Sequence, residues 1–360
     1  MWHASTKLAS VSRSTHSRSL GANKKKAHTP CRPGNKCAAM VLLRPTTFLV
    51  VLAALPTLVP AAPKYFGWYG DVTPTLSVTG ATSNLVQANS VASAIIAKAA
   101  GQDVLLLTEA YFPGLRAAKP DFKTVWEAAL PELKSLITNK TIFGFALGDE
   151  LVWGSVTPAN LVEYANTVRA SFPRGEAVIW YNEACFFSGP RSGWHNGAHK
   201  PVPDYTIPEA IDWFSIDQYH MDGPVPGWVQ AHVEPWYQRN IYPNLTKYQS
   251  VMVVPGAFGS NVNHYPNGTF ICDNACYDKM CAQDAGDFYE WARRDPRVVA
   301  ISPWNWMGCA GCNGSRWTPP KTCCMDEIGA RDQPLTRAAW FKIGAEIKEN
   351  SQVAISRPQD

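Results

Sequence analysis

Residues 142–150 read Ile-Phe-Gly-Phe-Ala-Leu-Gly-Asp-Glu, and this stretch carries the clearest structural signal of the chain. Its apolar part, Ile142–Leu147, has the length and composition of a strand buried on both faces, as in a parallel sheet. Gly148-Asp149-Glu150 then ends the run with two acids just before the next helical pattern. Because functional side chains gather at the carboxyl ends of parallel strands, we expect a site here.

The same alternation of a short apolar run and a longer amphipathic segment recurs along the chain. Eight runs are predicted strands: Tyr65–Tyr69, Asn84–Ala88, Asp103–Leu107, Ile142–Leu147, Ala177–Tyr181, Trp213–Asp217, Val251–Val254 and Val298–Ser302. Helical patterns lie between most of them, at residues 90–100, 121–138, 158–171, 227–240, 282–294 and 334–349. This order predicts an α/β fold, a (β/α)8 TIM barrel, as a single catalytic domain over residues 63–360. A doubly wound open sheet is the alternative, but no glycine-rich phosphate loop follows any strand.

Four segments depart from this rhythm. Residues 71–83 and 186–208 show no clear helix, and the cysteine-bearing segments 259–281 and 307–333 are predicted long loops after the seventh and eighth strands. Thr157-Pro158, in contrast, gives one helix a cap and a first-turn proline.

Cysteine usage points to disulfides in these loops. Eight cysteines follow residue 63: Cys185, Cys272, Cys276, Cys281, Cys309, Cys312, Cys323 and Cys324. An even number in an exported chain predicts up to four disulfides. The spacing of Cys309 and Cys312 would also suit zinc, but export and the adjacent Cys323-Cys324 favour disulfides. We therefore predict no metal and no cofactor.

The amino-terminal region predicts export. Residues 40–62 have the features of a signal peptide, with Arg44 as the positive flank, an apolar run at Phe48–Leu55 and small residues at its end. The run is too short for a permanent membrane span. Residues 1–39 are predicted to be a disordered basic extension or a mis-assigned start. Sequons at Asn139, Asn244, Asn267 and Asn313 also fit a secreted glycoprotein.

The charge distribution argues against nucleic acid as a partner. Residues 1–63 hold nine Lys and Arg and no acid, so the remainder carries 24 basic and 29 acidic residues, a net charge of −5. Phosphate binding needs a basic surface, which this body does not offer. The sequence gives no indication of an oligomeric state.

Acids and aromatic residues accumulate at the predicted carboxyl ends of the strands. This combination suits a carbohydrate, because sugar rings stack on aromatic faces and their hydroxyls bind polar side chains. Candidate substrate-binding residues are Trp68, Tyr69, Asp71, Glu109, Tyr111, Trp153, Tyr181, Asn182, Tyr219, His220, Trp304 and Trp306.

Four acids are candidates for catalysis: Glu150, Asp149, Glu183 and Asp217. Cleavage of a glycosidic bond needs a protonated carboxyl and a second group that attacks or stabilises the anomeric carbon. We expect Glu150 to be the acid, and Glu183 on the neighbouring strand to approach it at the roughly 5–5.5 Å of a retaining pair. Asp217 is expected farther away, as an inverting base or a hydroxyl ligand. The alternative is that Asp149 or Glu150 only caps a helix.

Gly148-Asp149-Glu150 resembles the strand-four acid of TIM-barrel glycoside hydrolases. Its adjacent Asp149 and Glu150 also resemble the Asp–Glu pair of family 20 hexosaminidases. The resemblance implies that Glu150 is the general acid and that Asp149 orients a substrate acetamido group acting as the nucleophile. The sequence departs from another large barrel clan, which carries Asn-Glu after strand four and a nucleophilic Glu after strand seven. Residues 251–258 contain no acid.

Three possibilities therefore remain open: substrate-assisted chemistry through Asp149, a nucleophile from Glu183 or Asp217, or no catalysis at all. The prediction is a secreted glycoside hydrolase acting on a carbohydrate. A non-catalytic, lectin-like barrel that binds carbohydrate is the alternative.

Overall fold

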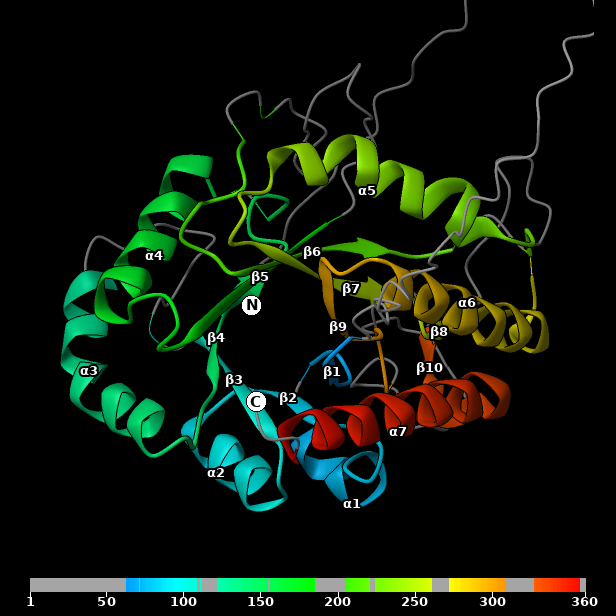
Figure 1. Cartoon of the computed structure of the whole chain (residues 1–360), viewed down its shortest axis with the longest axis horizontal. Coiled ribbons are helices and arrows are strands. Elements are labelled where there is room, and N and C mark those ends of the chain that lie inside the picture. The colour runs from blue at the N-terminus through cyan, green and yellow to red at the C-terminus, as the bar shows by residue number, and fades with distance from the viewer. Residues whose placement is uncertain are drawn as a thin grey trace, which may run out of the picture. The chain divides into compact units, whose positions relative to one another are not determined.

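The protein is seen here in a computed structural model, which describes residues 63–70, 72–108, 111, 122–154, 156–184, 202, 205–220, 224–260, 272–307 and 327–356. Its centre is a ring of parallel strands (Figure 1). These are β1 (Tyr65–Phe66), β2 (Leu85–Ala88), β3 (Asp103–Leu107), β4 (Gly144–Asp149), β5 (Val178–Glu183), β6 (Trp213–Gln218), β7 (Ser250–Pro255) and β9 (Val298–Ile301). Each overlaps one of the eight predicted strands, so the (β/α)8 prediction is confirmed.

The strands pair in the order β1-β9-β7-β6-β5-β4-β3-β2, and every pairing is parallel. The seam between β1 and β2 is bridged by Asn84. Its backbone N–H donates to the Phe66 carbonyl at 3.0 Å, and its side-chain oxygen accepts from the Phe66 N–H at 2.8 Å. The barrel is therefore nearly closed, with one asparagine replacing ladder bonds that the two-residue β1 is too short to make.

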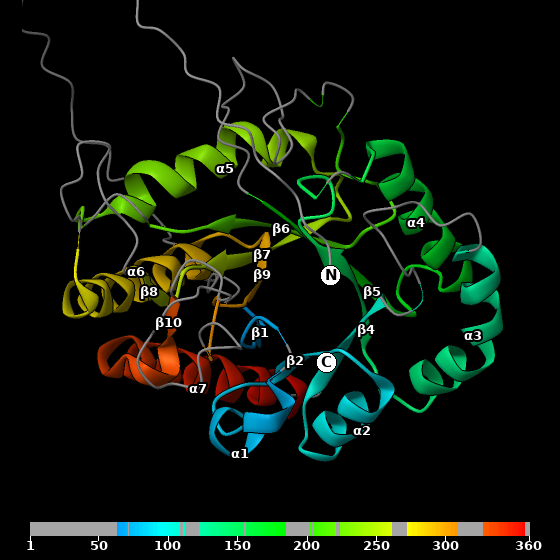
Figure 2. The same cartoon turned by 180° about the vertical axis from the view of Figure 1, so that it is seen from behind.

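Helices surround the strands, as both views show (Figures 1 and 2). They are α1 (Leu76–Thr79), α2 (Val91–Ala99), α3 (Phe122–Thr138), α4 (Pro158–Ser171), α5 (Glu234–Asn240), α6 (Asn274–Arg294) and α7 (Pro334–Ser356). A π-helical turn, Val229–Val233, leads into α5, and short 3-10 turns lie at Thr73–Thr75, Tyr242–Asn244 and Ala330–Asp332. The predicted cap of α4 is confirmed, because the Thr157 hydroxyl accepts from the Asn160 N–H at 3.2 Å.

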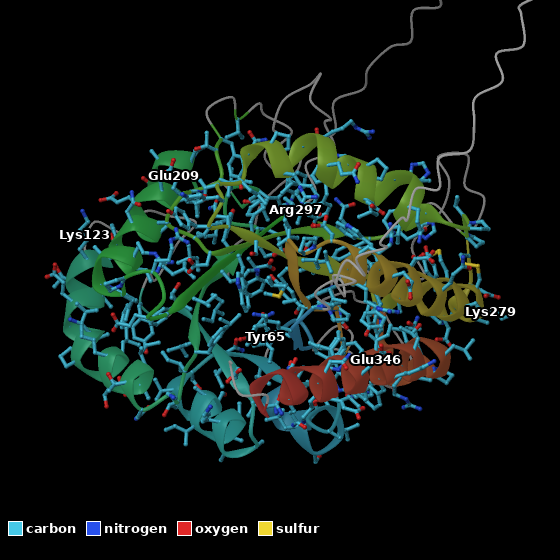
Figure 3. The ribbon with its side chains drawn as sticks, in the orientation of Figure 1. Tyr65, Lys123, Glu209, Lys279, Arg297 and Glu346 are labelled. Atoms are coloured by element: carbon cyan, nitrogen blue, oxygen red, sulfur yellow. A yellow bond between two sulfur atoms is a disulfide. The ribbon has the colours of Figure 1, made fainter. Side chains whose placement is uncertain are left out.

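Side chains fill both the barrel and the layer outside it (Figure 3). One buried cluster lies inside the ring of strands: Tyr69, Leu85, Leu105, Ala146, Trp180, Trp213, Met252, Val254 and Ala300. A larger cluster lies between the strands and the helices. Because both faces of each strand are buried, the strands read as continuous apolar runs.

Asp212 ties the amino-terminal end of β6 to the segment that follows α4. Its carboxylate pairs with Arg169 of α4 and with Arg174, and it also accepts from the Ile179 N–H at 2.8 Å. Two of the four predicted sequons lie in described segments that precede strands. Asn139 comes before β4 and Asn244 before β7, and both are exposed.

The segment after β7 is more regular than predicted. Helix α6 begins at Asn274, inside the expected loop 259–281, because the Asp273 carboxylate accepts from the Cys276 N–H at 2.8 Å and caps the helix. Strand β8 (Phe258–Ser260) pairs antiparallel with β10 (Glu327–Gly329), a two-stranded sheet that the sequence did not indicate.

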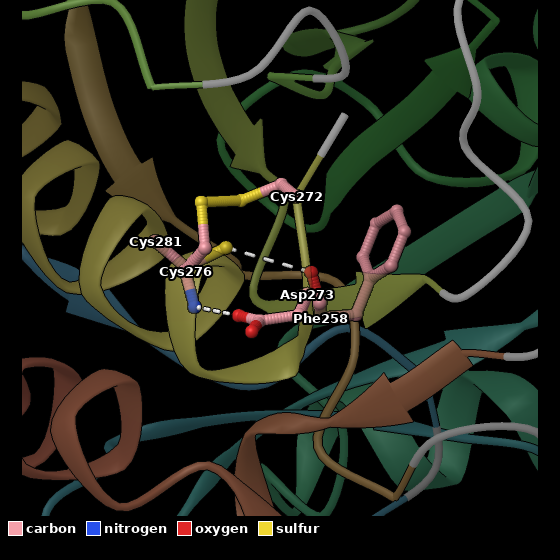
Figure 4. Close-up of a disulfide and its surroundings, with 5 residues drawn as sticks. All are labelled: Phe258, Cys272, Asp273, Cys276 and Cys281. Atoms are coloured by element: carbon pink, nitrogen blue, oxygen red, sulfur yellow. Dashed lines mark hydrogen bonds between the residues drawn. A yellow bond between two sulfur atoms is a disulfide. The ribbon is translucent and has the colours of Figure 1, made fainter. Parts of the chain in front are cut away.

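Cys272 and Cys276 form a disulfide across the start of α6 (Figure 4). Cys281, one helical turn further, is a buried free thiol whose sulfur lies 3.5 Å from the Phe258 carbonyl oxygen. Of the three cysteines in the described residues, two form a disulfide and one is free, so the upper limit of four disulfides falls to three. The other five cysteines lie outside the described residues. Within the described part of the chain, no helix is long and apolar enough to cross a membrane.

Candidate active site

The carboxyl end of β4 contains a bulge that turns its acids into the barrel. Ala146 pairs with Trp180 and Asp149 with Asn182, so three steps along β4 match two along β5. Simple alternation from the inward-facing Ala146 would point Asp149 outward. The extra residue reverses that phase, as bulges beside active sites do.

The backbone of this bulge is unusual. Gly148 has φ +152°, and a side chain there would meet a Leu151 methyl at 2.7 Å. Glu150 has φ +47°, the left-handed region that a non-glycine residue adopts only at a cost of roughly 1 kcal/mol or more. Such a conformation needs support. Here the Glu150 N–H donates to the Asn182 carbonyl at 3.1 Å, and the Glu150 carbonyl accepts from the Gly154 N–H at 2.7 Å.

Asp149 and Asp217 are joined through Asn182, which is fully buried. The amide nitrogen of Asn182 donates to Asp149 Oδ1 at 2.9 Å and to Asp217 Oδ1 at 2.8 Å. Asp149 Oδ1 also accepts from the Tyr69 hydroxyl at 2.5 Å. Among the described residues Asp149 Oδ2 accepts no hydrogen bond, so this oxygen is the one available to a ligand.

Glu150 completes a group of three carboxyls. Its side chain is hydrogen-bonded to that of Asp217, which is only 5% exposed. Burial raises the pKa of Asp217 well above its usual range, and the charges of Asp149 and Glu150 raise it further. Burial and the neighbouring carboxyls therefore favour the protonated form of Asp217.

Aromatic rings wall this group of acids. Tyr69 packs edge-on against Trp180 at 5.5 Å between ring centroids and against Trp304 at 5.2 Å. Tyr219 packs edge-on against Phe258 at 5.2 Å. Burial and the charge of Asp149 raise the pKa of Tyr69 well above 10, so its hydroxyl stays protonated as a donor. Trp304 and Tyr219 are half-buried and pack against the cluster inside the barrel.

Glu183 lies elsewhere than expected. Its carboxylate accepts hydrogen bonds from the backbone N–H groups of Val152 at 2.9 Å, Trp153 at 3.2 Å and Ala184 at 2.9 Å. The Tyr181 hydroxyl donates to it as well. Burial raises its pKa to about 7, with the four donors acting in the opposite direction. The expectation that Glu183 pairs with Glu150 is wrong. Strand alternation points it outward, and Asp217 takes that place.

Several predicted sugar contacts are buried outside the barrel. Trp68 and Trp306, at most 2% exposed, pack on each other at 5.0 Å, and Trp306 stacks on Phe341 of α7. Tyr181 is fully buried in the outer cluster, and Tyr111 and Trp153 pack at its edge. The buried positions of Trp68, Trp306 and Tyr181 contradict the prediction that they line the site, because side chains in the outer cluster face helices. For the half-buried Tyr111 and Trp153 a sugar contact stays a prediction.

His220 is also packed away from the carboxyls. Its Nδ1 lies 2.8 Å from Asp284 Oδ2 of α6, and its ring stacks on Trp228 at 4.4 Å. It is 5% exposed, so a direct substrate contact is not supported. Asp71 and Glu109 lie outside the described residues.

Two contributors to the site were not predicted. Trp180 Nε1 donates to Ser215 Oγ at 2.9 Å, and the Ser215 hydroxyl donates to Asn182 Oδ1 at 2.6 Å. The signal was present in the sequence, since Trp180 and Asn182, like Ser215 and Asp217, are two residues apart and share a strand face. In the described part of the chain no cluster of His, Cys, Asp and Glu could hold a metal ion.

Comparison with solved structures identifies similar barrels. A glycoside hydrolase of type GH5_18 from Bifidobacterium longum subsp. infantis has a TM-score of 0.50 at 11% identity, covering 79% of each chain. A glucosidase from Croceicoccus marinus has a TM-score of 0.49 at 14% identity, covering 80% of this chain and 69% of that one. A β-D-glucuronidase for Dictyoglomus thermophilum has a TM-score of 0.49 at 11% identity, covering 81% of this chain and 51% of that one.

The likeness to the GH5_18 structure bears on the fold alone. The chain spans about half the length of the first structures it matches. No family model matches the chain, and no curated protein does. The structures named here are of glycoside hydrolases, but they lend no specific support to the resemblance to family 20.

Proposed function

We propose that the protein is a secreted glycoside hydrolase in which Glu150 protonates the leaving oxygen of a glycosidic bond. The observation that carries the proposal is the hydrogen-bonded pair of Asp217 and Glu150 beside Asp149, in an aromatic-walled barrel mouth. A general acid must be protonated at the working pH, and a buried pair of carboxyls that share a proton meets this requirement. Trp304 and Tyr219 would supply the stacking surface for sugar rings.

Asp149 is the best candidate for the second group. Glu183 is fully engaged by backbone donors, and burial raises the pKa of Asp217, which favours its protonated form and makes it a poorer nucleophile. Asp149, in contrast, accepts two hydrogen bonds on Oδ1 and keeps Oδ2 open among the described residues. That oxygen would either attack the anomeric carbon or orient a substrate acetamido group that does so.

The test is turnover of a panel of chromogenic glycosides and polysaccharides by wild type, Glu150→Gln and Asp149→Asn. We expect Glu150→Gln to cost about 10²–10⁴-fold in rate on a natural glycan, and less on an activated aryl glycoside whose leaving group needs little protonation. Glu176→Gln, an exposed acid in the loop before β5, is the matched control. Wild-type turnover by Glu150→Gln on the natural glycan would remove Glu150 from the mechanism.

A lectin-like barrel is the second candidate, favoured by the lack of any acid between Ser250 and Ser260. It predicts that wild type binds glycans without turnover and that Glu150→Gln leaves this binding unchanged. Export is tested separately, by expressing the full chain in a secreting host and determining where the mature amino terminus begins.

A further inference from the structure

We propose that Trp180 and Ser215 are positioning residues that fix the orientation of the Asn182 amide, and thereby direct the proton of Asp217 toward Glu150. The three side chains form a hydrogen-bonded chain inside the barrel that ends on two of the candidate catalytic carboxyls. The catalytic consequence rests on the proposed function, whereas the orientation itself does not.

The direction of the chain follows from its first member. An indole N–H can only donate, so Ser215 Oγ, 2.9 Å from Trp180 Nε1, must accept. The Ser215 hydroxyl proton is then free to go to Asn182 Oδ1 at 2.6 Å, a shorter contact than the 3.4 Å to the Tyr181 carbonyl. Ser215 and Asn182 are both fully buried, so water does not compete for these contacts.

The orientation of the Asn182 amide decides whether the two neighbouring carboxyls face its N–H donors or its oxygen. With Oδ1 bound by Ser215, the amide nitrogen faces Asp149 Oδ1 and Asp217 Oδ1 and donates one proton to each. A turned amide would present an oxygen to both carboxyls and disfavour their ionised forms. Because Asp217 Oδ1 already accepts from Asn182, the proton of Asp217 is directed to Oδ2 and the bond with Glu150.

Few titratable side chains lie around Asp217 in the described structure. The titratable side chains around Asp217 in the described structure are Asp149 and Glu150 at the end of β4, with Tyr69 after β1. Tyr219 lies close enough to raise the pKa of Tyr69. On the other side β7 contributes Val254, which cannot ionise. The Asn182 amide is thus the uncharged group that donates hydrogen bonds to two of these acids, Asp149 and Asp217.

The experiment is the pH dependence of kcat/KM for Ser215→Ala, with Ser215→Thr as the rescue that keeps the hydroxyl. Ser302→Ala is the matched control, since Ser302 is an equally buried barrel serine that accepts from Gln87 at 3.3 Å. In Ser215→Ala the amide of Asn182 loses its anchor, and both limbs of the profile should move to higher pH by about one unit. Wild type, Ser215→Thr and Ser302→Ala should share one profile. A Ser215→Ala profile that superimposes on that of wild type overturns the proposal.

A second measurement does not need activity. In protein labelled with ¹³C at the aspartate carboxyls, the Asp149 and Asp217 signals are assigned from Asp149→Asn and Asp217→Asn. Ser215→Ala should raise the titration midpoint of Asp217 by about one pH unit, because that carboxyl loses the donor that Asn182 supplies. An unchanged midpoint in a folded variant overturns the positioning role. Absence of turnover by wild type would defeat the proposed function alone and leave this titration as the test.

Discussion

Replacing Glu183 with alanine should lower stability strongly, because its carboxylate supports the turn that carries the candidate acid. The side chain is fully buried and receives three backbone N–H groups and one tyrosine hydroxyl. Without it these donors lose their acceptor, and the turn after Glu150 loses its anchor to β5. Buried donors left unpaired cost about 1–3 kcal/mol each, less where water enters, so we expect a loss of about 3–5 kcal/mol at pH 5.

The loss should depend on pH with a definite sign. The pKa of Glu183 in the folded state is about 7, against an ordinary value of 4.5, so the folded protein binds this proton more tightly than the unfolded chain does. The stabilising contribution is therefore fully present below pH 4.5 and is lost as the pH rises through 7. The separation corresponds to about 3 kcal/mol, at about 1.4 kcal/mol for each pH unit. The deficit of Glu183→Ala should shrink by that amount between pH 4 and pH 8.

Urea unfolding followed by tryptophan fluorescence, at several pH values, measures both quantities. Glu183→Gln, which keeps the volume and two polar atoms, serves as the companion variant and should retain turnover within a few fold of wild type at 25 °C. The structural assignment would be refuted by a Glu183→Ala protein as stable as wild type at pH 5. It would equally be refuted by a stable Glu183→Gln protein that loses about a hundredfold or more in turnover, the loss typical of a catalytic acid or base.

Three further predictions address other parts of the chain. Burial raises the pKa of the Cys281 thiol, so iodoacetamide should alkylate it only after denaturation, and rapid labelling of native protein would contradict the buried placement. Asp212→Asn should lower the unfolding free energy by about 2–4 kcal/mol, because it leaves two partly buried arginines without their anion, while the pH–rate profile stays that of wild type. In a secreting host, Asn139→Gln and Asn244→Gln should each lower the intact mass by one endoglycosidase-sensitive glycan, and an unchanged mass would show that the sequon is unused.

The fold was predictable because each strand is buried on two faces. Continuous apolar runs such as Val251–Val254 show no polar alternation, and in the described chain helices separate most of the eight barrel strands. The start of α6 was not found, since it lies among cysteines and depends on the capping carboxylate of Asp273. Strands β8 and β10 were missed for a related reason, because each is three residues long and pairs only through a distant partner.

The sequence located the site at the carboxyl ends of the strands, but it did not show which face of each strand lines the barrel. The rule that carboxyl ends of strands converge correctly gathered Asp149, Glu150 and Asp217, yet it included Tyr181 and Glu183 with equal weight. Both lie on the outward face of β5, while Asn182 lies on the inward face. A run in which every position is buried does not show which of two alternating sets lines the barrel. That information comes from the register with the neighbouring strands.

The bulge in β4 explains how a barrel without an acid at the end of β7 still assembles three carboxyls. In a regular strand Asp149 and Glu150 would point to opposite faces, and only one of them could reach the mouth. The inserted residue turns Asp149 inward beside Asn182, and the left-handed backbone of Glu150 lets the next side chain reach Asp217. One strand end thus supplies two acids and β6 supplies the third. The strain at Glu150 is offset by backbone hydrogen bonds and by the Glu183 carboxylate, which binds the turn that follows. The outward-facing Glu183 thus supports the geometry of the two acids at the end of β4.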